Sequence, residues 1–330
     1  MSKLTLSLGI SYYDHVADLI GGRVRPEGID LQCLVFPVEE IFFRFVLHRE
    51  WDVSELSLGK YSSLISHGDN SLVAIPVFPS RIFRHSSIYV RSGGPIKGPQ
   101  DLANARVGIP EWAQTATIYC RGLLQHQYGI DLSGIRWFQA GVNEAGRAEK
   151  VNLSLPPDIR LTPVPDGTLN DMLLTGVIDA AITAHPPHAF APGDDSPIKR
   201  LLSDSMGLES AYYRETGIFP IMHVIAIQRA VFERHPWVAG NLLTAFEEAK
   251  RRSLERALEI TASRFPIPWA YEAVSRAREV FGENYWPYGL DSNRKTLDSF
   301  LQFAFEQGVC RKRLTPDDLF PPQVAHTYKI

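Results

Sequence analysis

The feature that most constrains the fold is an alternation of strand-like and helix-like segments along the chain. In the first part, strand-like runs at 3–9, 28–36 and 51–57 are each followed by a helix-like segment, of which 38–48 shows the clearest helical spacing of large apolar residues. Consecutive parallel strands need a long crossover between them, and a helix is the usual one. The alternation therefore predicts an α/β fold with a mainly parallel, helix-covered sheet.

A second series of the same kind follows a Gly/Pro-rich change of character at 91–99. Two extended apolar segments, 77–90 and 216–227, connect the two series. A single core rarely grows beyond about 250 to 300 residues, so a chain of 330 residues has room for two lobes. We expect one lobe from 1–92 with 223–330, completed by C-terminal helices, and another from 93–222. A ligand cleft is expected between them.

Composition excludes several classes of protein. The formal net charge of −3 gives no general attraction to nucleic acid or to an anionic membrane. No apolar run reaches the roughly 18 residues that a membrane span needs, and the first residues turn polar before a signal-peptide core can form. The three cysteines lack the spacing of a disulfide or zinc framework. The sequence predicts a cytoplasmic protein with a small-molecule partner and leaves homo-oligomerisation open.

One short stretch of the first connecting segment concentrates groups that bind anions. Residues 77–90, VFPSRIFRHSSIYV, place Arg81, Arg84 and His85 within five positions. Arginine matches a carboxylate with a planar fork of donors, and histidine can transfer a proton near neutral pH. The second connecting segment carries Phe219 and His223, so both segments can deliver side chains to one cleft. The alternative is that the arginines are solvated loop charges and His85 is a core residue.

Polar residues also follow strands in both series, where α/β folds place ligand-contacting loops. Free backbone N–H groups at the helix starts that follow would attract an anion. In the alternative interpretation these residues cap helices. The candidates are Ser54, Glu55 and Ser57 in the first series, Glu111, Trp112 and Thr115 in the second, and Tyr12 after the first strand.

Two histidines, His185 and His188, follow the last strand of the second series. Their spacing suggests a metal pair, but the two prolines between them prevent a regular helix and no acidic residue completes an obvious triad. Hydrogen bonding to a substrate, a surface position and a divalent metal site all remain open.

Five segments, in their order, resemble the 4,5-dihydroxyphthalate decarboxylase family. They are SELSL at 54–58, FPSRIFRH at 78–85, VGIPE at 107–111, RG at 121–122 and TGIFPIMH at 216–223. The similarity extends from about residue 4 to the helices near residue 249. It implies a type 2 periplasmic-binding-protein-like fold and a cytoplasmic aromatic-acid decarboxylase, although the fold alone does not distinguish an enzyme from a binding protein.

The resemblance gives the candidate residues roles. Loss of CO₂ from a hydroxylated ring requires a proton on the carbon that bears the carboxylate. Arg81 and Arg84 are expected to anchor a retained carboxylate. The candidates for proton transfer are His85, Glu111, His223, His185 and His188, and those for other substrate contacts are Ser54, Glu55, Ser57, Trp112, Thr115, Phe219 and Tyr12.

We therefore expect a decarboxylase that needs no cofactor and converts 4,5-dihydroxyphthalate to protocatechuate. The alternatives are a non-catalytic solute-binding protein for an aromatic or dicarboxylic acid, and a metal-assisted hydrolase or lyase.

Overall fold

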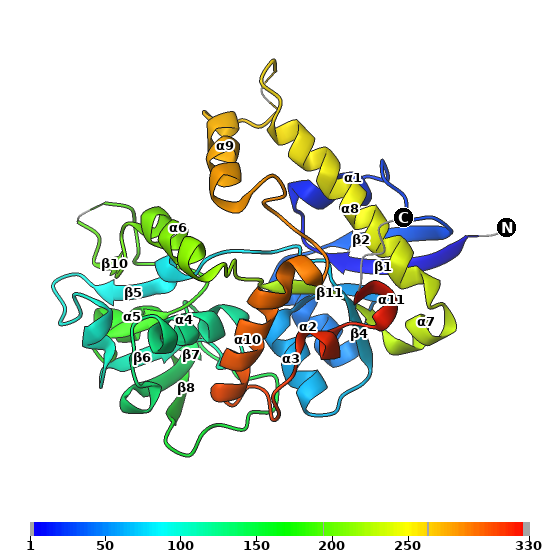
Figure 1. Ribbon diagram of the computed structural model, residues 1–330. Coiled ribbons are helices and arrows are strands. Elements are labelled where there is room, and N and C mark those ends of the chain that lie inside the picture. The colour runs from blue at the N-terminus through cyan, green and yellow to red at the C-terminus, as the bar shows by residue number, and fades with distance from the viewer. Residues whose placement is uncertain (1–2, 194, 263, 326–330) are drawn as a thin grey trace.

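The computed structural model describes residues 3–193, 195–262 and 264–325, which form two lobes (Figure 1). The first lobe holds a five-stranded sheet in the order β2-β1-β3-β11-β4. Its strands are β1 (Leu4–Ile10), β2 (Ile29–Val35), β3 (Val53–Ser57), β4 (Leu72–Ile75) and β11 (His223–Gln228). β1 runs parallel to β2 and β3, whereas β11 runs antiparallel to β3 and β4. The returning chain thus enters the centre of the first sheet.

The helices of the first lobe are α1 (Ala17–Ile20), α2 (Val38–His48) and α3 (Leu58–Ser66). α2 matches the predicted segment because Ile41, Phe42 and Phe45 form one buried stripe. β3 is buried at all five positions, so the polar side chains at its end lie inside the molecule.

The second lobe holds a six-stranded sheet in the order β10-β5-β9-β6-β7-β8. β6 is parallel to β7 and β9, and β7 to β8, while β5 is antiparallel to β9 and β10. The α/β class is as predicted. The strands are β5 (Ile88–Arg91), β6 (Arg106–Ile109), β7 (Arg136–Gly141), β8 (Arg160–Thr168), β9 (Ala180–Ile182) and β10 (Ile198–Arg200), and the helices are α4 (Thr115–His126), α5 (Leu169–Leu174) and α6 (Ser205–Thr216).

The chain crosses between the lobes earlier than expected. β5 pairs within the second sheet, so the crossing ends before residue 88 rather than near residue 92. The two crossing segments are hydrogen-bonded to each other, since Met222 N donates to Ser80 O at 2.9 Å and Ile82 N to Pro220 O at 3.2 Å. Residues 80–82 and 220–223 therefore meet between the lobes.

The C-terminal helices cover more than the first lobe. They are α7 (Arg229–Arg234), α8 (Trp237–Ala257), α9 (Ala270–Phe281), α10 (Arg294–Glu306) and α11 (Pro322–Ala325). α8 packs on α1, but α10 contacts both α3 and α4 and so touches both lobes (Figure 1). None of the helices in the described ranges has the length and apolar character of a membrane span.

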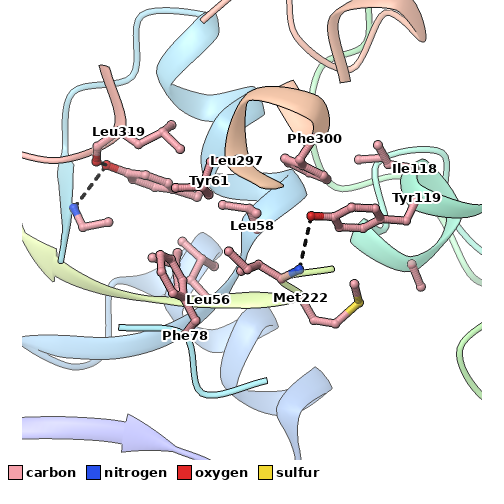
Figure 2. Close-up of a cluster of buried hydrophobic side chains, with 14 of the residues drawn as sticks. Leu56, Leu58, Tyr61, Phe78, Ile118, Tyr119, Met222, Leu297, Phe300 and Leu319 are labelled. Atoms are coloured by element: carbon pink, nitrogen blue, oxygen red, sulfur yellow. Dashed lines mark hydrogen bonds between the residues drawn. The ribbon is translucent and has the colours of Figure 1, made fainter. Parts of the chain in front are cut away.

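A shared core lies where α10 meets the two lobes. Figure 2 shows Phe300 and Leu297 of α10 above Leu58 and Tyr61 of α3, with Tyr119 of α4 beside them. The hydroxyl of Tyr119 accepts a hydrogen bond from Ile221 N at 3.2 Å, which fastens α4 to the return crossing. The lobes are thus joined by packing as well as by the two crossings.

Candidate active site

A cavity of about 280 Å³ lies between the lobes beside the two crossings. Part of its wall is apolar, from Val38, Phe42, Ile82, Ala116, Ala184 and Met222, and the rest is polar or charged, from Glu39, Ser57, Lys60, Ser80, Arg84, Glu111, Gln114, Thr115, Arg147, Lys150, His185 and His223. Its volume is at the small end of the range for ligand pockets, which suits a compact molecule.

His223, the first residue of β11, faces the cavity and is held from behind by Glu55 of β3. Its Nδ1 lies 2.6 Å from Glu55 Oε1, which also accepts a 2.6 Å hydrogen bond from the Tyr13 hydroxyl. Ser11 N donates to the other oxygen, Oε2, at 2.9 Å. The β3–β11 register explains the contact, because His223 pairs with Ser57, two residues from Glu55 on the same face.

These hydrogen bonds determine the protonation of the pair. Burial raises the pKa of Glu55, but the hydrogen bond and charge of His223, together with the donors Tyr13 and Ser11, outweigh it and lower the pKa below its ordinary value. Glu55 is therefore a carboxylate, which can only accept, so His223 Nδ1 carries the hydrogen. Nε2 is left for proton exchange within the cavity.

Glu111, just after β6, organises a cluster of cations on another part of the wall. Its carboxylate contacts Lys60 Nζ, Arg147 Nε at 2.6 Å and Lys150 Nζ at 2.9 Å. Burial raises the pKa of Glu111, but the charges of these three residues lower it to about 2. Arg147 also donates to Glu39 Oε1 at 3.1 Å, so three cations against two carboxylates leave one excess positive charge on this wall. A carboxylate with a pKa this low is a poor proton acceptor or donor near neutral pH. The surroundings of Glu111 therefore do not support the expected role in proton transfer.

Several polar contacts cross directly from one lobe to the other at the cavity. Lys60 belongs to α3 of the first lobe and Glu111 to the second. Ser57 Oγ and Thr115 Oγ1 lie 2.9 Å apart, and Gly59 N donates to Thr115 Oγ1 at 3.0 Å. Ser57 and Thr115 therefore line the cavity as expected, and they also join β3–α3 to the start of α4.

Two curated proteins named 4,5-dihydroxyphthalate decarboxylase are similar to this chain. The protein from Comamonas testosteroni is 37% identical over 331 residues, which cover all of both chains. The protein from Pseudomonas putida is 38% identical over 215 residues, covering 65% of this chain and 83% of that one. The chain belongs to the 4,5-dihydroxyphthalate decarboxylase family. A scan against protein-family models gave no match.

Solved structures of binding proteins share the fold of this chain. The periplasmic aliphatic sulphonate binding protein SsuA from Escherichia coli superposes with a TM-score of 0.54 at 14% identity, covering 97% of this chain and 98% of that one. SsuA from Xanthomonas axonopodis pv. citri bound to MOPS gives a TM-score of 0.53 at 12% identity, covering 97% and 99%. The expected type 2 periplasmic-binding-protein-like fold is confirmed, and identities this low show the fold alone.

The two arginines of the first crossing have different surroundings. Arg84 lines the cavity, where its Nε lies 3.2 Å from Met222 Sδ. Arg81 does not line it. Its guanidinium donates to Phe219 O at 3.1 Å and to Pro287 O at 2.8 Å, and it contacts Asn293 Oδ1. The donors of Arg81 are thus used in buried hydrogen bonds that hold the C-terminal segment. This placement does not fit the expected role of Arg81 as a substrate anchor.

Other expected residues also lie away from the cavity. His85 is buried behind Arg84, and Trp112 is buried with its Nε1 donating to Gln307 O at 2.7 Å. Phe219 stacks on Phe83 and Phe281. Ser54 Oγ donates to Glu55 O at 2.9 Å, and Tyr12 is exposed. These five placements do not support direct substrate contact.

The histidines after β9 lie at the rim. His185 lines the cavity, is 59% exposed, and its Nε2 lies 3.7 Å from Glu39 Oε1. His188 faces the adjoining hollow, where its backbone N donates to Asn143 Oδ1 at 2.8 Å. No group of three or more His, Cys, Asp or Glu side chains suited to a metal occurs in the described part of the chain. The donor set of the two histidines is therefore incomplete for the metal site that the sequence left open.

Five residues that matter most to this geometry were absent from the sequence-based candidates. Lys60 follows the conspicuous polar end of β3, and Tyr13 is adjacent to the candidate Tyr12. Phe42 lies in the apolar stripe of α2, and its ring meets His223 edge-on at 4.8 Å. Arg147 and Lys150 occur in a polar connection without any periodic pattern. Their only sequence signal is that charged groups follow the end of β7, where α/β folds bind ligands.

Proposed function

We propose that this protein is a carboxy-lyase that converts 4,5-dihydroxyphthalate to protocatechuate and CO₂. The names of its full-length and partial relatives support this substrate. The observation that carries the proposal is that one small cavity combines a wall of excess positive charge with an imidazole backed by a carboxylate. A dianionic aromatic acid that must receive a proton needs both.

The cationic wall suits one of the two neighbouring carboxylates. Lys60, Arg147 and Lys150 already share Glu111, and their remaining N–H donors, with those of Arg84, would bind the carboxylate that the product retains. The departing carboxylate should be held less firmly, because an interaction that is lost in the transition state slows the reaction. The apolar wall around Phe42 and Met222 provides such surroundings.

His223 is the proposed proton donor. As imidazolium, it transfers the Nε2 proton to the ring carbon that bears the departing carboxylate, while the hydroxyl para to that carbon releases electron density into the ring. The bond to the carboxylate then breaks, its electron pair restores the aromatic ring, and CO₂ leaves. Glu55 stabilises the imidazolium and fixes its orientation. Each turnover consumes one proton, which neutral His223 regains from water.

The scheme assigns no step to a metal or an organic cofactor, and independence from both is part of the proposal. Purified protein incubated with 4,5-dihydroxyphthalate should form protocatechuate and CO₂ in equal amounts, with the same rate after chelator treatment. Product that forms only with added metal would contradict the cofactor-independent scheme. No product under either condition would overturn the proposed activity.

His223→Gln should lower kcat by about 100- to 10,000-fold, the usual contribution of a positioned acid or base. The matched control is His48→Gln, because His48 is exposed at the end of α2. A His223→Gln enzyme with nearly normal kcat would remove His223 from the mechanism, whatever the activity of the wild type.

The similarity to sulfonate-binding proteins supports a second candidate, a non-catalytic receptor for an aromatic dicarboxylate. It predicts saturable binding of 4,5-dihydroxyphthalate without turnover, so the product assay separates the two functions. Cytoplasmic location and a homo-oligomeric state stay predictions.

A further inference from the structure

A half-buried acid and a buried histidine lie beside the cavity arginine. His85 follows Arg84 in the chain, and its Nδ1 lies 3.9 Å from Glu209 Oε1 on α6. Among the described residues, neither ring nitrogen of His85 nor Glu209 Oε1 has a hydrogen-bond partner. Such orphaned atoms are costly in a protein interior and call for an explanation. A shift of about 1 Å would bring them to hydrogen-bonding distance.

Burial disfavours the charged form of both groups. Burial raises the pKa of Glu209 to about 7, against the opposing effects of the Ser86 N–H and the charges of Arg200 and Arg84. Burial lowers the pKa of His85, and the side chain of Gln127, just after α4, opposes this shift. The titratable and charged groups around the pair are Arg84, Arg200 and Tyr212, and those around Arg84 itself are Glu209, Cys120 and Tyr89.

A single proton therefore decides the charge of the pair. With one proton shared, the pair is neutral overall, whether the proton is on the carboxyl or on the imidazole. Loss of that proton leaves a Glu209 carboxylate, which attracts the positive charge of Arg84. The charge of Glu209 already acts on Arg84, because it opposes the lowering of the Arg84 pKa by burial. Arg84 is free to respond, because it has no ion pair of 4.0 Å or less with a carboxylate in the described part of the chain.

We propose that Glu209 and His85 are positioning residues that share one proton and thereby keep Arg84 directed into the cavity. When the proton is lost, the Glu209 carboxylate draws the guanidinium away from the retained carboxylate of the substrate, and binding weakens as pH rises. The inference rests on the proposed function in one respect, that Arg84 contacts an aromatic dicarboxylate. It gives His85 a role behind the site instead of in the chemistry.

The test measures binding of phthalate, which lacks the hydroxyl groups that the reaction needs, between about pH 6.5 and 9. Wild type and Glu209→Gln are compared by titration calorimetry at each pH. At pH 6.5 their Kd values should agree, because glutamine mimics the protonated acid. At pH 9 the wild type should bind about tenfold more weakly than the variant. The ratio of the two Kd values cancels the effect of His223, which both proteins contain.

Two further variants make the outcome decisive. Glu215→Gln, exposed on the same helix, should follow the wild type at every pH. In Arg84→Met, binding should be weak, and adding Glu209→Gln should change it less than twofold at any pH. This double variant keeps the test valid if Glu209→Gln alone perturbs α6.

A Kd ratio that stays constant from pH 6.5 to 9 would overturn the inference while leaving the decarboxylase proposal intact. Both proposals would be supported if the wild type decarboxylates 4,5-dihydroxyphthalate, the ratio of Kd values rises with pH as expected, and Glu209→Gln leaves kcat unchanged. If phthalate failed to bind at every pH, the inference would fall, because Arg84 would then have no dicarboxylate to anchor, whereas the product assay would still decide the decarboxylase proposal.

Discussion

At the scale of single residues, the site depends on one buried carboxylate, Glu55, whose two oxygens both accept hydrogen bonds. Glu55 accepts from His223 and Tyr13 at Oε1 and from Ser11 N at Oε2. Hydrogen bonds to a charged group contribute about 1.5 to 3 kcal/mol each, so every donor helps to keep Glu55 ionised inside the protein. An ionised Glu55 in turn fixes His223 Nδ1 as the hydrogen-bond donor and leaves Nε2 for the cavity. Tyr13 therefore acts on the proposed proton donor, His223, indirectly through Glu55.

Tyr13→Phe removes one of these hydrogen bonds and keeps the ring. We expect kcat to fall about tenfold with little change in KM, which corresponds to about 1.4 kcal/mol in the transition state. Steady-state kinetics with 4,5-dihydroxyphthalate measure both constants. The adjacent Tyr12→Phe is the matched control and should match the wild type, because Tyr12 is 65% exposed. A change confined to KM would mean that Tyr13 binds substrate and does not position His223.

Residue chemistry could be predicted from the sequence better than residue placement. Glu55 and His223 are near one another because β3 pairs with β11, and Arg84 reaches the same cavity from the first connecting segment, as the prediction of two segments that serve one cleft implied. Arg81 and Arg84 have the same side chain three positions apart, yet only one lines the cavity. The difference arises from Pro287 and Asn293, more than two hundred residues further along the chain. Partners so remote leave no signal in the local sequence.

At the scale of secondary-structure elements, the cavity depends on the close approach of α3 to the start of α4. A Cβ atom on Gly59 would lie 2.6 Å from Ala113 O and 2.9 Å from Ile118 Cδ1. Lys60 and Ser57 flank this contact and both line the cavity. The glycine therefore sets how closely two elements from different lobes can approach.

Gly59→Ala should push α3 and α4 apart. Overpacking of this kind costs about 1 to 3 kcal/mol, and the separation should raise KM by displacing Lys60 from Glu111. Gly240→Ala in α8 is the control, because, apart from its chain neighbours and the backbone of its own helix, no described atom lies within 4 Å of the position that a Cβ would take there. A helical Gly→Ala change at such an open position should stabilise by about 0.5 to 1 kcal/mol. Chemical denaturation and steady-state kinetics give both quantities. A Gly59→Ala protein as stable as the wild type would contradict the proposed close packing.

Elements with a strong periodic pattern were predictable, and those without one were not. The apolar stripe of α2 located that helix, whereas α6 was not predicted. Only Tyr212 of α6 is buried, so the helix has no apolar stripe, and its start is fixed locally by Asp204 Oδ1 accepting from Gly207 N at 3.1 Å. Glu209, on this helix, was missed for the same reason.

At the scale of the whole molecule, the C-terminal segment ties together two lobes that resemble those of binding proteins. Phe303 of α10 packs against Gly122 of α4, leaving no room for a side chain there. The backbone and side chain of Gln307 accept from Trp112 Nε1 at 2.7 Å and Arg121 Nε at 2.9 Å. Because α10 also contacts α3 of the first lobe, separating the lobes would expose this buried polar network. We infer that the cavity is held closed by the protein itself.

A permanently closed cavity predicts that ligand binding leaves the overall dimensions unchanged. Small-angle X-ray scattering should give a radius of gyration of about 20 Å, the value for a compact chain of this length, both without ligand and with saturating phthalate. Gln307→Ala removes the acceptor for Arg121 and leaves a buried charge without that partner, so this variant should expand and then contract when phthalate binds. Gln302→Ala, on the same helix, is the control and should behave as the wild type does. Contraction of the wild type on binding would show that α10 does not hold the lobes together, and that the molecule closes on its ligand as a hinged receptor would.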